Sequence, residues 1–146
     1  GRLTMFLVDT NILIHGINKD SPDHEPARNA LQAYANGNER WAVSWGIIYE
    51  YLRISTHPRV FSKPLTIEQS WGFMEDLLKA PSLMVISETG AHQRVLETCK
   101  KDVHRLAGNL IHDFHIAVLM REHGIREIVT MDTDFRAFPW VRIKGL

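Results

Sequence analysis

The residues most suited to chemistry in this sequence are four acids that stand in largely apolar surroundings: Asp9, Glu50, Asp113 and Asp132. Two of them come just after short apolar runs, and the other two lie within segments with helical spacing. Burying an unpaired carboxylate is costly, so several acids directed at one place need cations, hydrogen bonds or shared protons. We therefore expect a divalent cation to balance their charge.

The donor types indicate which cation this is. Carboxylate oxygens without a cysteine cluster favour a hard ion, Mg²⁺ or Mn²⁺, over zinc, and Cys99 is the sole cysteine of the chain. Such an ion lowers the pKa of a bound water, orients a phosphodiester and neutralises charge on the leaving oxygen. The four acids therefore suit phosphate chemistry.

Each acid also has an ordinary structural explanation. Glu50 could pair with Arg53 one helical turn later. Asp113 could favour a helix N-terminus through the helix dipole, and Asp9 could be a helix cap. Asp132 could be a turn residue, since aspartate is common in turns. Taken singly, none of the four residues indicates a site.

Basic and histidine side chains near the acids add further candidates. Arg53 could reach a scissile phosphate instead of pairing with Glu50, and His112 is a candidate for phosphate contact. The spacing of His112 and His115 places both rings on one side of a helix, which also suits metal ligation. We do not favour that role, because the four carboxylates already supply a hard-cation site.

The elements that must position these residues alternate along the chain. Short apolar runs predict strands at residues 6–8, 41–43, 83–86, 128–129 and 141–143. Helical spacing predicts helices at 11–17, 24–35, from the Ser44 cap to about residue 57, from the Thr66 cap to Pro81, at 90–106 and at 111–123. This alternation predicts an α/β fold, a three-layer α/β/α sandwich with a central parallel sheet of four to five strands. Ligands of such sheets bind at the carboxyl ends of the strands, where Asp9 and Asp132 lie.

Composition limits the class of protein. The chain has 146 residues, 45% hydrophobic and 23% charged, which suits one globular domain. Its 17 basic and 17 acidic residues cancel, so no global positive field indicates a nucleic-acid partner. A single cysteine excludes an internal disulfide, and the apolar runs are too short to span a membrane, so we expect a cytoplasmic protein. Because Met5 directly precedes the first apolar run, we expect a domain over residues 5–146 and take residues 1–4 as a remnant of the expression vector.

Taken in order, four segments of the sequence resemble the PIN-domain family. They are Leu7-Val8-Asp9-Thr10-Asn11-Ile12-Leu13, the helix with Glu50, the helix opening with Asp113, and Thr130-Met131-Asp132-Thr133-Asp134-Phe135. The short chain and the run His57-Pro58-Arg59-Val60-Phe61 are similar to the VapC-type toxins of bacterial toxin–antitoxin pairs. The resemblance spans nearly the whole chain.

The resemblance implies an endoribonuclease that depends on Mg²⁺ or Mn²⁺, is held inactive by a cognate VapB-type antitoxin and forms a homodimer. It implies that the catalytic and metal-binding residues are Asp9, Glu50, Asp113 and Asp132, supported by Asn11, Thr130 and Asp134. An alternative is a noncatalytic binding module that grips an arginine of a protein partner in the same acidic pocket. A phosphatase that uses Asp9 is weaker, because the sequence lacks the adjacent acidic pair expected there.

Overall fold

A five-stranded parallel sheet forms the centre of the computed structural model, which describes residues 4–146. Its strands are β1 (Met5–Val8), β2 (Arg40–Ser44), β3 (Leu83–Ile86), β4 (Glu127–Val129) and β5 (Arg142–Lys144). They lie in the order β3-β2-β1-β4-β5, and every neighbouring pair is parallel. The predicted parallel sheet is therefore confirmed. The prediction that residues 1–4 are a remnant of the expression vector falls mostly on residues 1–3, which lie outside the described part of the chain.

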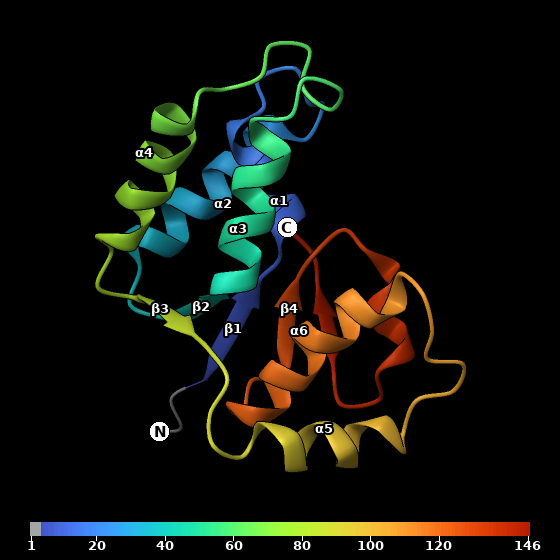
Figure 1. Cartoon of the computed structure of the whole chain (residues 1–146). Helices are drawn as coiled ribbons and strands as arrows, with labels where there is room; N and C mark the ends of the chain where they lie inside the picture. Colours follow the sequence, from blue (N-terminus) through green and yellow to red (C-terminus); the bar gives the residue numbers. More distant parts are fainter. Residues whose placement is uncertain (1–3) are drawn as a thin grey trace.

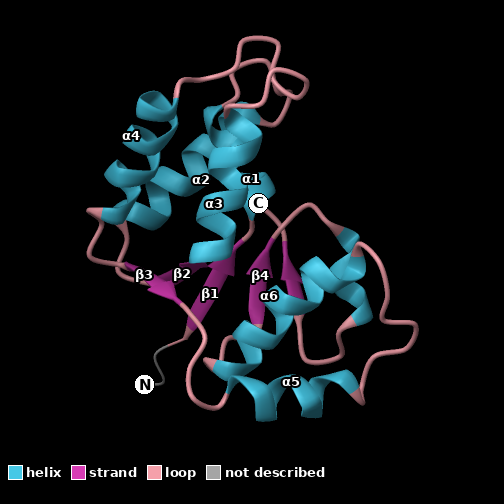
Figure 2. Cartoon of the chain, viewed as in Figure 1, coloured by secondary structure: helices cyan, strands magenta, loops and turns pink. Residues whose placement is uncertain are grey.

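Helices flank the sheet in two groups (Figures 1 and 2). The first group comprises α1 (Thr10–Ile17), α2 (His24–Asn36), α3 (Trp45–Ser55) and α4 (Ile67–Leu78). The second group, beside β4, comprises α5 (His92–Lys100) and α6 (Leu110–Glu122), with a short 3₁₀ helix, η1 (Thr133–Ala137), after β4. Within residues 4–146, no helix is both long and apolar enough to cross a bilayer.

Local sequence explains where the helices of the first group begin. The Ser44 side chain accepts a hydrogen bond from the backbone N–H of Ile47 at 3.1 Å, as the predicted cap requires. At α4, Thr66 and Gln69 form a reciprocal capping box. The inward faces of these helices and the apolar strands form one continuous core, in which Trp41 and Tyr51 are fully buried. The core holds the strand ends rigidly in place.

The end of α5 differs from the prediction. The helix stops at Lys100, not at residue 106. Arg105 has a φ of 55°, which a right-handed helix cannot contain, so the chain turns away before that point. Val103 and Leu106 still pack against the core, but they do so from the connecting loop. Their helical spacing therefore reflected burial and not helix continuation.

The carboxyl edge of β1 and β4 is the place where the chain reverses its direction of winding. From β1 the sheet grows through β2 and β3 to one side, and β4 and β5 lie on the other. Val8 and Val129 are partners in register at the ends of the two strands. Ligands of open α/β sheets bind at such a switch point. Asp9 and Asp132 therefore follow neighbouring strands, at the carboxyl edge of the sheet where the sequence predicted them.

Candidate active site

Asp9 lies at the end of β1 and is buried, with 5% of its surface exposed. It is also the N-cap of α1, so its cap role and its place in the pocket coexist. One carboxylate oxygen accepts a hydrogen bond from the Thr10 N–H at 2.8 Å, and the other accepts from the Thr130 hydroxyl at 2.7 Å. Burial raises the pKa of Asp9, and these two hydrogen bonds oppose that rise. Asp9 is thus a desolvated carboxylate with a fixed orientation.

Asn11 connects the ends of the two central strands. Its amide nitrogen donates to Asp9 Oδ2 at 3.2 Å and to Thr130 Oγ1 at 2.9 Å, and its amide oxygen accepts from the Met131 N–H at 3.1 Å. A side chain with both a donor and an acceptor is needed for this bridge. Asn11 and Thr130 therefore position Asp9 and the turn after β4.

The turn after β4 presents two more carboxylates. Thr130 Oγ1 accepts from the Asp132 N–H at 3.0 Å, and Asp132 in turn accepts from the Asp134 N–H at 2.9 Å. Asp132 is the N-cap of η1, so it is a turn residue as well as a pocket residue. One carboxylate oxygen each of Asp113, Asp132 and Asp134 lies within 4.8 Å of the others. The turn directs both of its aspartates towards α6.

Asp113, in the first turn of α6, is the acid with the most perturbed proton affinity. Its surface is 8% exposed. Burial, followed by the interaction with Asp132 and then the charges of Asp9 and Asp134, raises its pKa from 3.8 to about 8. Without a bound cation, the pocket therefore favours the protonated form of this carboxyl at neutral pH.

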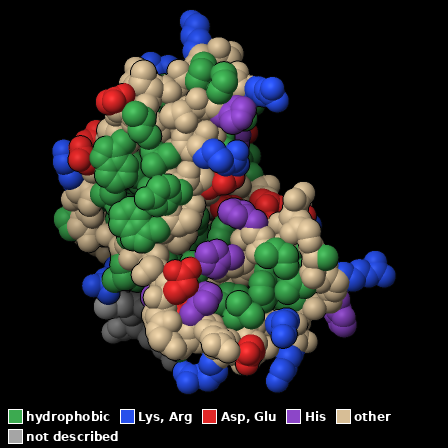
Figure 3. All heavy atoms as spheres, viewed as in Figure 1, with side chains coloured by type: hydrophobic (Ala, Val, Ile, Leu, Met, Phe, Trp, Pro, Cys, Tyr) green, Lys and Arg blue, Asp and Glu red, His purple; other side chains and the backbone are tan. Residues whose placement is uncertain are grey.

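The pocket that contains these acids has a volume of about 240 Å³. It opens between the two helix groups, where acidic and histidine side chains gather in a hollow of the surface (Figure 3). Glu50 on α3 and His112 on α6 line it together with Asp9, Asp113 and Asp132. Glu50 is held by Arg53, whose Nη2 lies 2.9 Å from Glu50 Oε1. All four predicted acids therefore share one pocket, and the alternative pairing of Glu50 with Arg53 is also present.

Thr10, which the sequence analysis did not single out as a site residue, lines the pocket and carries a buried hydroxyl. Its Oγ1 is buried and, within the described part of the chain, has no hydrogen-bond partner. A buried polar atom without a partner costs about 1–3 kcal/mol. No feature of the sequence distinguishes this threonine from an ordinary first-turn residue.

The donor set fits a hard divalent cation. The pocket and the turn beside it offer oxygen ligands from carboxylates and a hydroxyl, which Mg²⁺ and Mn²⁺ prefer. The raised pKa values of Asp9 and Asp113 indicate carboxylates whose charged forms lack a compensating cation in the protein itself. Asp134 joins the close group of ligand atoms, whereas Glu50 lines the pocket from α3 without belonging to that trio.

The two histidines beside Asp113 have different environments. His112 lines the acidic pocket. His115 instead forms a 2.6 Å contact with Glu88, which follows β3. The close group of ligand atoms around His115 comprises Glu88 and His92. The spacing of the two histidines therefore does not define a shared metal site, in agreement with the preference for oxygen ligands.

Comparison with known proteins identifies relatives over nearly the whole chain. The family model of the PIN domain matches residues 6–141. The chain is 31% identical over 140 residues to "Ribonuclease VapC48" of Mycobacterium tuberculosis, covering 93% of each chain. It is 33% identical over 138 residues to "Ribonuclease VapC37" of the same organism, covering 94% of each.

Solved structures show the same fold. The structure of VapBC2 from Rickettsia felis, bound to a DNA fragment from its promoter, matches with a TM-score of 0.67 and 20% identity, covering 97% of this chain and 98% of that one. VapC20 of Mycobacterium tuberculosis, described as a toxin that cleaves the sarcin-ricin loop, matches with a TM-score of 0.64 and 18% identity, covering 94% and 98%. These likenesses confirm the predicted α/β architecture.

Proposed function

Because this chain belongs to the PIN-domain family, we propose that it is a metal-dependent endoribonuclease and the toxin of a type II toxin–antitoxin pair. The observation that carries the proposal is the convergence of Asp9, Glu50, Asp113 and Asp132 in one pocket at the carboxyl edge of β1 and β4. Relatives named as ribonucleases, aligned over more than nine-tenths of the chain, support RNA as the substrate.

We assign the cation to the carboxylates of this pocket. Asp9, Asp113 and Asp132, together with Asp134 and with Glu50 from the facing helix, would hold Mg²⁺ or Mn²⁺. When bound, such an ion lowers the pKa of a water and offsets the negative charge of the phosphodiester.

The protein's own groups prepare the pocket for a polyanion. Without a bound cation, the raised pKa of Asp113, about 8, keeps this carboxyl mostly protonated at neutral pH and so lowers the negative charge of the pocket; a bound cation would replace that proton. Arg53 holds Glu50, which lines the pocket, and the Arg53 side chain is 61% exposed, so it would remain accessible to a phosphate near Glu50. His112 offers a second contact, since an imidazole N–H can donate to a phosphate oxygen. N–H donors of Arg53 and His112 would thus complement the carboxylates of the pocket.

The cleavage experiment uses the purified chain and pooled cellular RNA, with and without Mg²⁺ or Mn²⁺, followed by mapping of the new RNA ends. We expect defined ends only in the presence of metal, and no cleavage by Asp132→Asn. Asp76→Asn is the matched control, because Asp76 is an exposed acid on α4 whose side chain is 79% accessible. Cleavage by the Asp132 variant at the wild-type rate would disprove the proposed site.

We propose a VapB-type antitoxin as the protein partner. An arginine that enters the pocket would form a bidentate, charge-assisted contact with the carboxylates and exclude the metal. The same contact would serve a noncatalytic binding module, the second candidate function, for which the open acidic pocket is equally suited. Metal-dependent cleavage by the isolated chain distinguishes them: a toxin cleaves RNA until the partner is added, and a binding module does not cleave it at all.

We further propose that residues 5–146 act as one domain that forms a homodimer. Exposed apolar side chains on α3 and α4 support this: Trp45 is 47%, Tyr49 68% and Ile67 52% exposed. Figure 3 shows hydrophobic side chains gathered over these helices. Such exposed apolar surface is typical of interaction sites. Sedimentation should give a dimer. A monomer at tens of micromolar would contradict the proposal, because that concentration is on the order of ten times a micromolar dissociation constant.

A further inference from the structure

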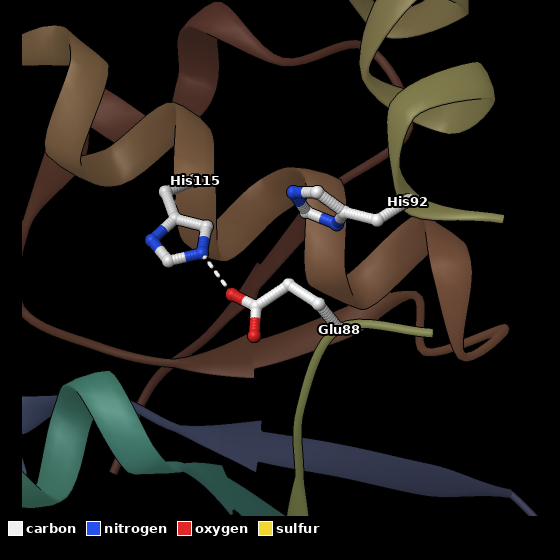
Figure 4. Close-up of side chains that lie close together, drawn as sticks. All are labelled: Glu88, His92 and His115. Atoms are coloured by element: carbon white, nitrogen blue, oxygen red, sulfur yellow. Dashed lines mark hydrogen bonds and ion pairs between the residues drawn. The ribbon is translucent and has the colours of Figure 1, made fainter. Parts of the chain in front are cut away.

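Two histidines and a glutamate from three separate elements meet outside the acidic pocket. Glu88 follows β3, His92 opens α5 and His115 lies on α6 (Figure 4). One ligand atom of each lies within 4.8 Å of the others, and His115 Nε2 lies 2.6 Å from Glu88 Oε1. These side chains are 27 residues or fewer apart in sequence, but only the packing of α5 on α6 brings them together.

A buried carboxylate orients the ring of His92. Glu122 on α6 lies 2.6 Å from His92 Nδ1, and its side chain has no exposed surface. The other oxygen of this carboxylate accepts hydrogen bonds from the backbone N–H and the hydroxyl of Thr89, which fixes its position. Because Glu122 occupies Nδ1, the Nε2 atom of His92 is left free for another partner. Figure 4 shows a ring nitrogen of His92 facing His115.

We propose that Glu88, His92 and His115 form a second cation site, which takes a transition-metal ion of the zinc class. Two imidazole nitrogens and one carboxylate suit zinc, cobalt or nickel better than magnesium. A histidine that donates its other nitrogen to a carboxylate is the usual arrangement around such ions. Three protein ligands leave the fourth position of a tetrahedral ion free. Solvent can reach that position, because the side chains of Glu88 and His115 are each 47% exposed.

This site is separate from the acidic pocket. Asp113 and His115 are two positions apart on α6, so their side chains point about 200° apart around the helix axis. None of the three proposed ligands lines the pocket that contains Asp9 and Asp113. The two sites also differ in chemistry, because one offers oxygen donors and the other offers mainly nitrogen donors.

The present geometry requires a small adjustment to admit an ion. Ligands about 2.0–2.2 Å from a tetrahedral ion lie about 3.3–3.6 Å from one another. His115 Nε2 and Glu88 Oε1, at 2.6 Å, must therefore move apart by about an ångström. Both side chains are half exposed and can move this far without disturbing the core. His92 stays in place through its contact with Glu122.

Cobalt titration of the metal-free protein tests the site, because low-coordinate cobalt with nitrogen ligands absorbs visible light far more strongly than six-coordinate cobalt in an oxygen site. The full chain is titrated with Co²⁺, and Zn²⁺ is then added as a competitor. We expect one equivalent of strongly absorbing cobalt, displaced by zinc. His115→Gln and Glu88→Gln should each weaken binding at least tenfold, since each removes one ligand from an exposed position.

Two matched variants locate the ion. His104→Gln, in the exposed loop after α5, removes a histidine outside the cluster and should leave cobalt binding unchanged. Asp132→Asn disables the acidic pocket and should also leave the absorption unchanged. The proposal is overturned if the wild type shows no strong absorption, if His115→Gln and Glu88→Gln bind cobalt as the wild type does, or if Asp132→Asn abolishes the signal. Circular dichroism of each variant verifies that it is folded.

Discussion

Replacing Asp113 by asparagine removes one negative charge from the acidic pocket and keeps the shape of the side chain. In the folded protein, burial and then the neighbouring Asp132 raise the pKa of Asp113 from 3.8 to about 8. The unfolded chain ionises the same group near its ordinary pKa. Between these two values the folded state binds more protons, so the wild type loses stability as the pH rises from about 4 to about 8. Asparagine at this position does not titrate and removes that loss.

The size of the effect follows from the shift. One pKa unit corresponds to about 1.4 kcal/mol, so the unscreened limit is about 6 kcal/mol. The pocket mouth is open to solvent, which screens the charges, and we expect Asp113→Asn to gain about 2 kcal/mol of unfolding free energy at pH 8. For a chain of this size that gain raises Tm by about 6–8 °C. At pH 4, which is close to the ordinary pKa of 3.8, little of that loss has yet developed, and the two proteins should melt within about two degrees of each other.

The assay pairs melting with cleavage. Melting curves are recorded in chelator at pH 4, 6 and 8, and RNA cleavage is measured with Mn²⁺. We expect Asp113→Asn to be more stable at pH 8 and unable to cleave RNA, because it lacks a proposed ligand. Asp76→Asn, which removes an exposed charge 3.6 Å from Lys79, should change neither property. A variant that melts at or below the wild type at pH 8 would refute the electrostatic reasoning, and undiminished cleavage would remove Asp113 from the catalytic set.

Three further substitutions test other parts of the site and fold. Asn11→Ala should lower the unfolding free energy by about 2 kcal/mol, because it removes the hydrogen bonds of Asn11 to Asp9, to Thr130 and to the Met131 N–H. Urea denaturation measures this, and a loss below about 0.5 kcal/mol would contradict the bridging role. Glu50→Gln should abolish cleavage but change stability by less than about 1 kcal/mol, since its pair is partly exposed; retained activity would argue against its assignment. Gly124→Ala should cost about 1 kcal/mol because the residue has a φ of 70°, and an unchanged Tm would show that the turn after α6 relaxes.

Asp9→Asn would be a less specific test of charge repulsion than Asp113→Asn. Asp9 Oδ2 accepts hydrogen bonds from both Asn11 and the Thr130 hydroxyl. An asparagine has only one oxygen, so its NH₂ group would face donors in either orientation. It would face Asn11 and the Thr130 hydroxyl in one orientation and the Thr10 N–H in the other. Loss of hydrogen bonds would then offset the relief of repulsion. The environment of each carboxylate, and not its type alone, decides what an isosteric exchange reports.

The sequence was sufficient to predict the sheet and the acids at its edge. Apolar runs that end in a polar residue, such as the one before Asp9, are typical of buried parallel strands, and the carboxyl ends of such strands converge. The local apolar pattern of β1 and β4 was therefore enough to predict that the residues after these two strands meet, although they are far apart in the sequence.

Other features depended on packing that no local pattern encodes. Sequence spacing paired His115 with His112, whereas docking of α5 on α6 places it beside His92. Within the described residues the Thr10 hydroxyl lacks a hydrogen-bond partner because of the atoms that surround it in the fold, and residue spacing in the sequence does not predict these atoms. The sequence analysis placed the end of α5 too late because Val103 and Leu106 lie in the loop after the helix but still pack against the core. Their spacing therefore continues the apolar periodicity of the helix.

The hydrogen bond between Thr130 and Asp9 joins residues 121 positions apart in the chain. A ribosome that adds about 5–20 residues per second needs roughly 6 to 24 s to make the intervening segment. During that time the nascent chain already carries Asp9 and Glu50 but lacks the turn that orients Asp9 and supplies Asp132. The acidic pocket thus cannot assemble until β4 has been synthesised and has paired with β1. Chain order delays the appearance of the complete site until translation of these residues is finished.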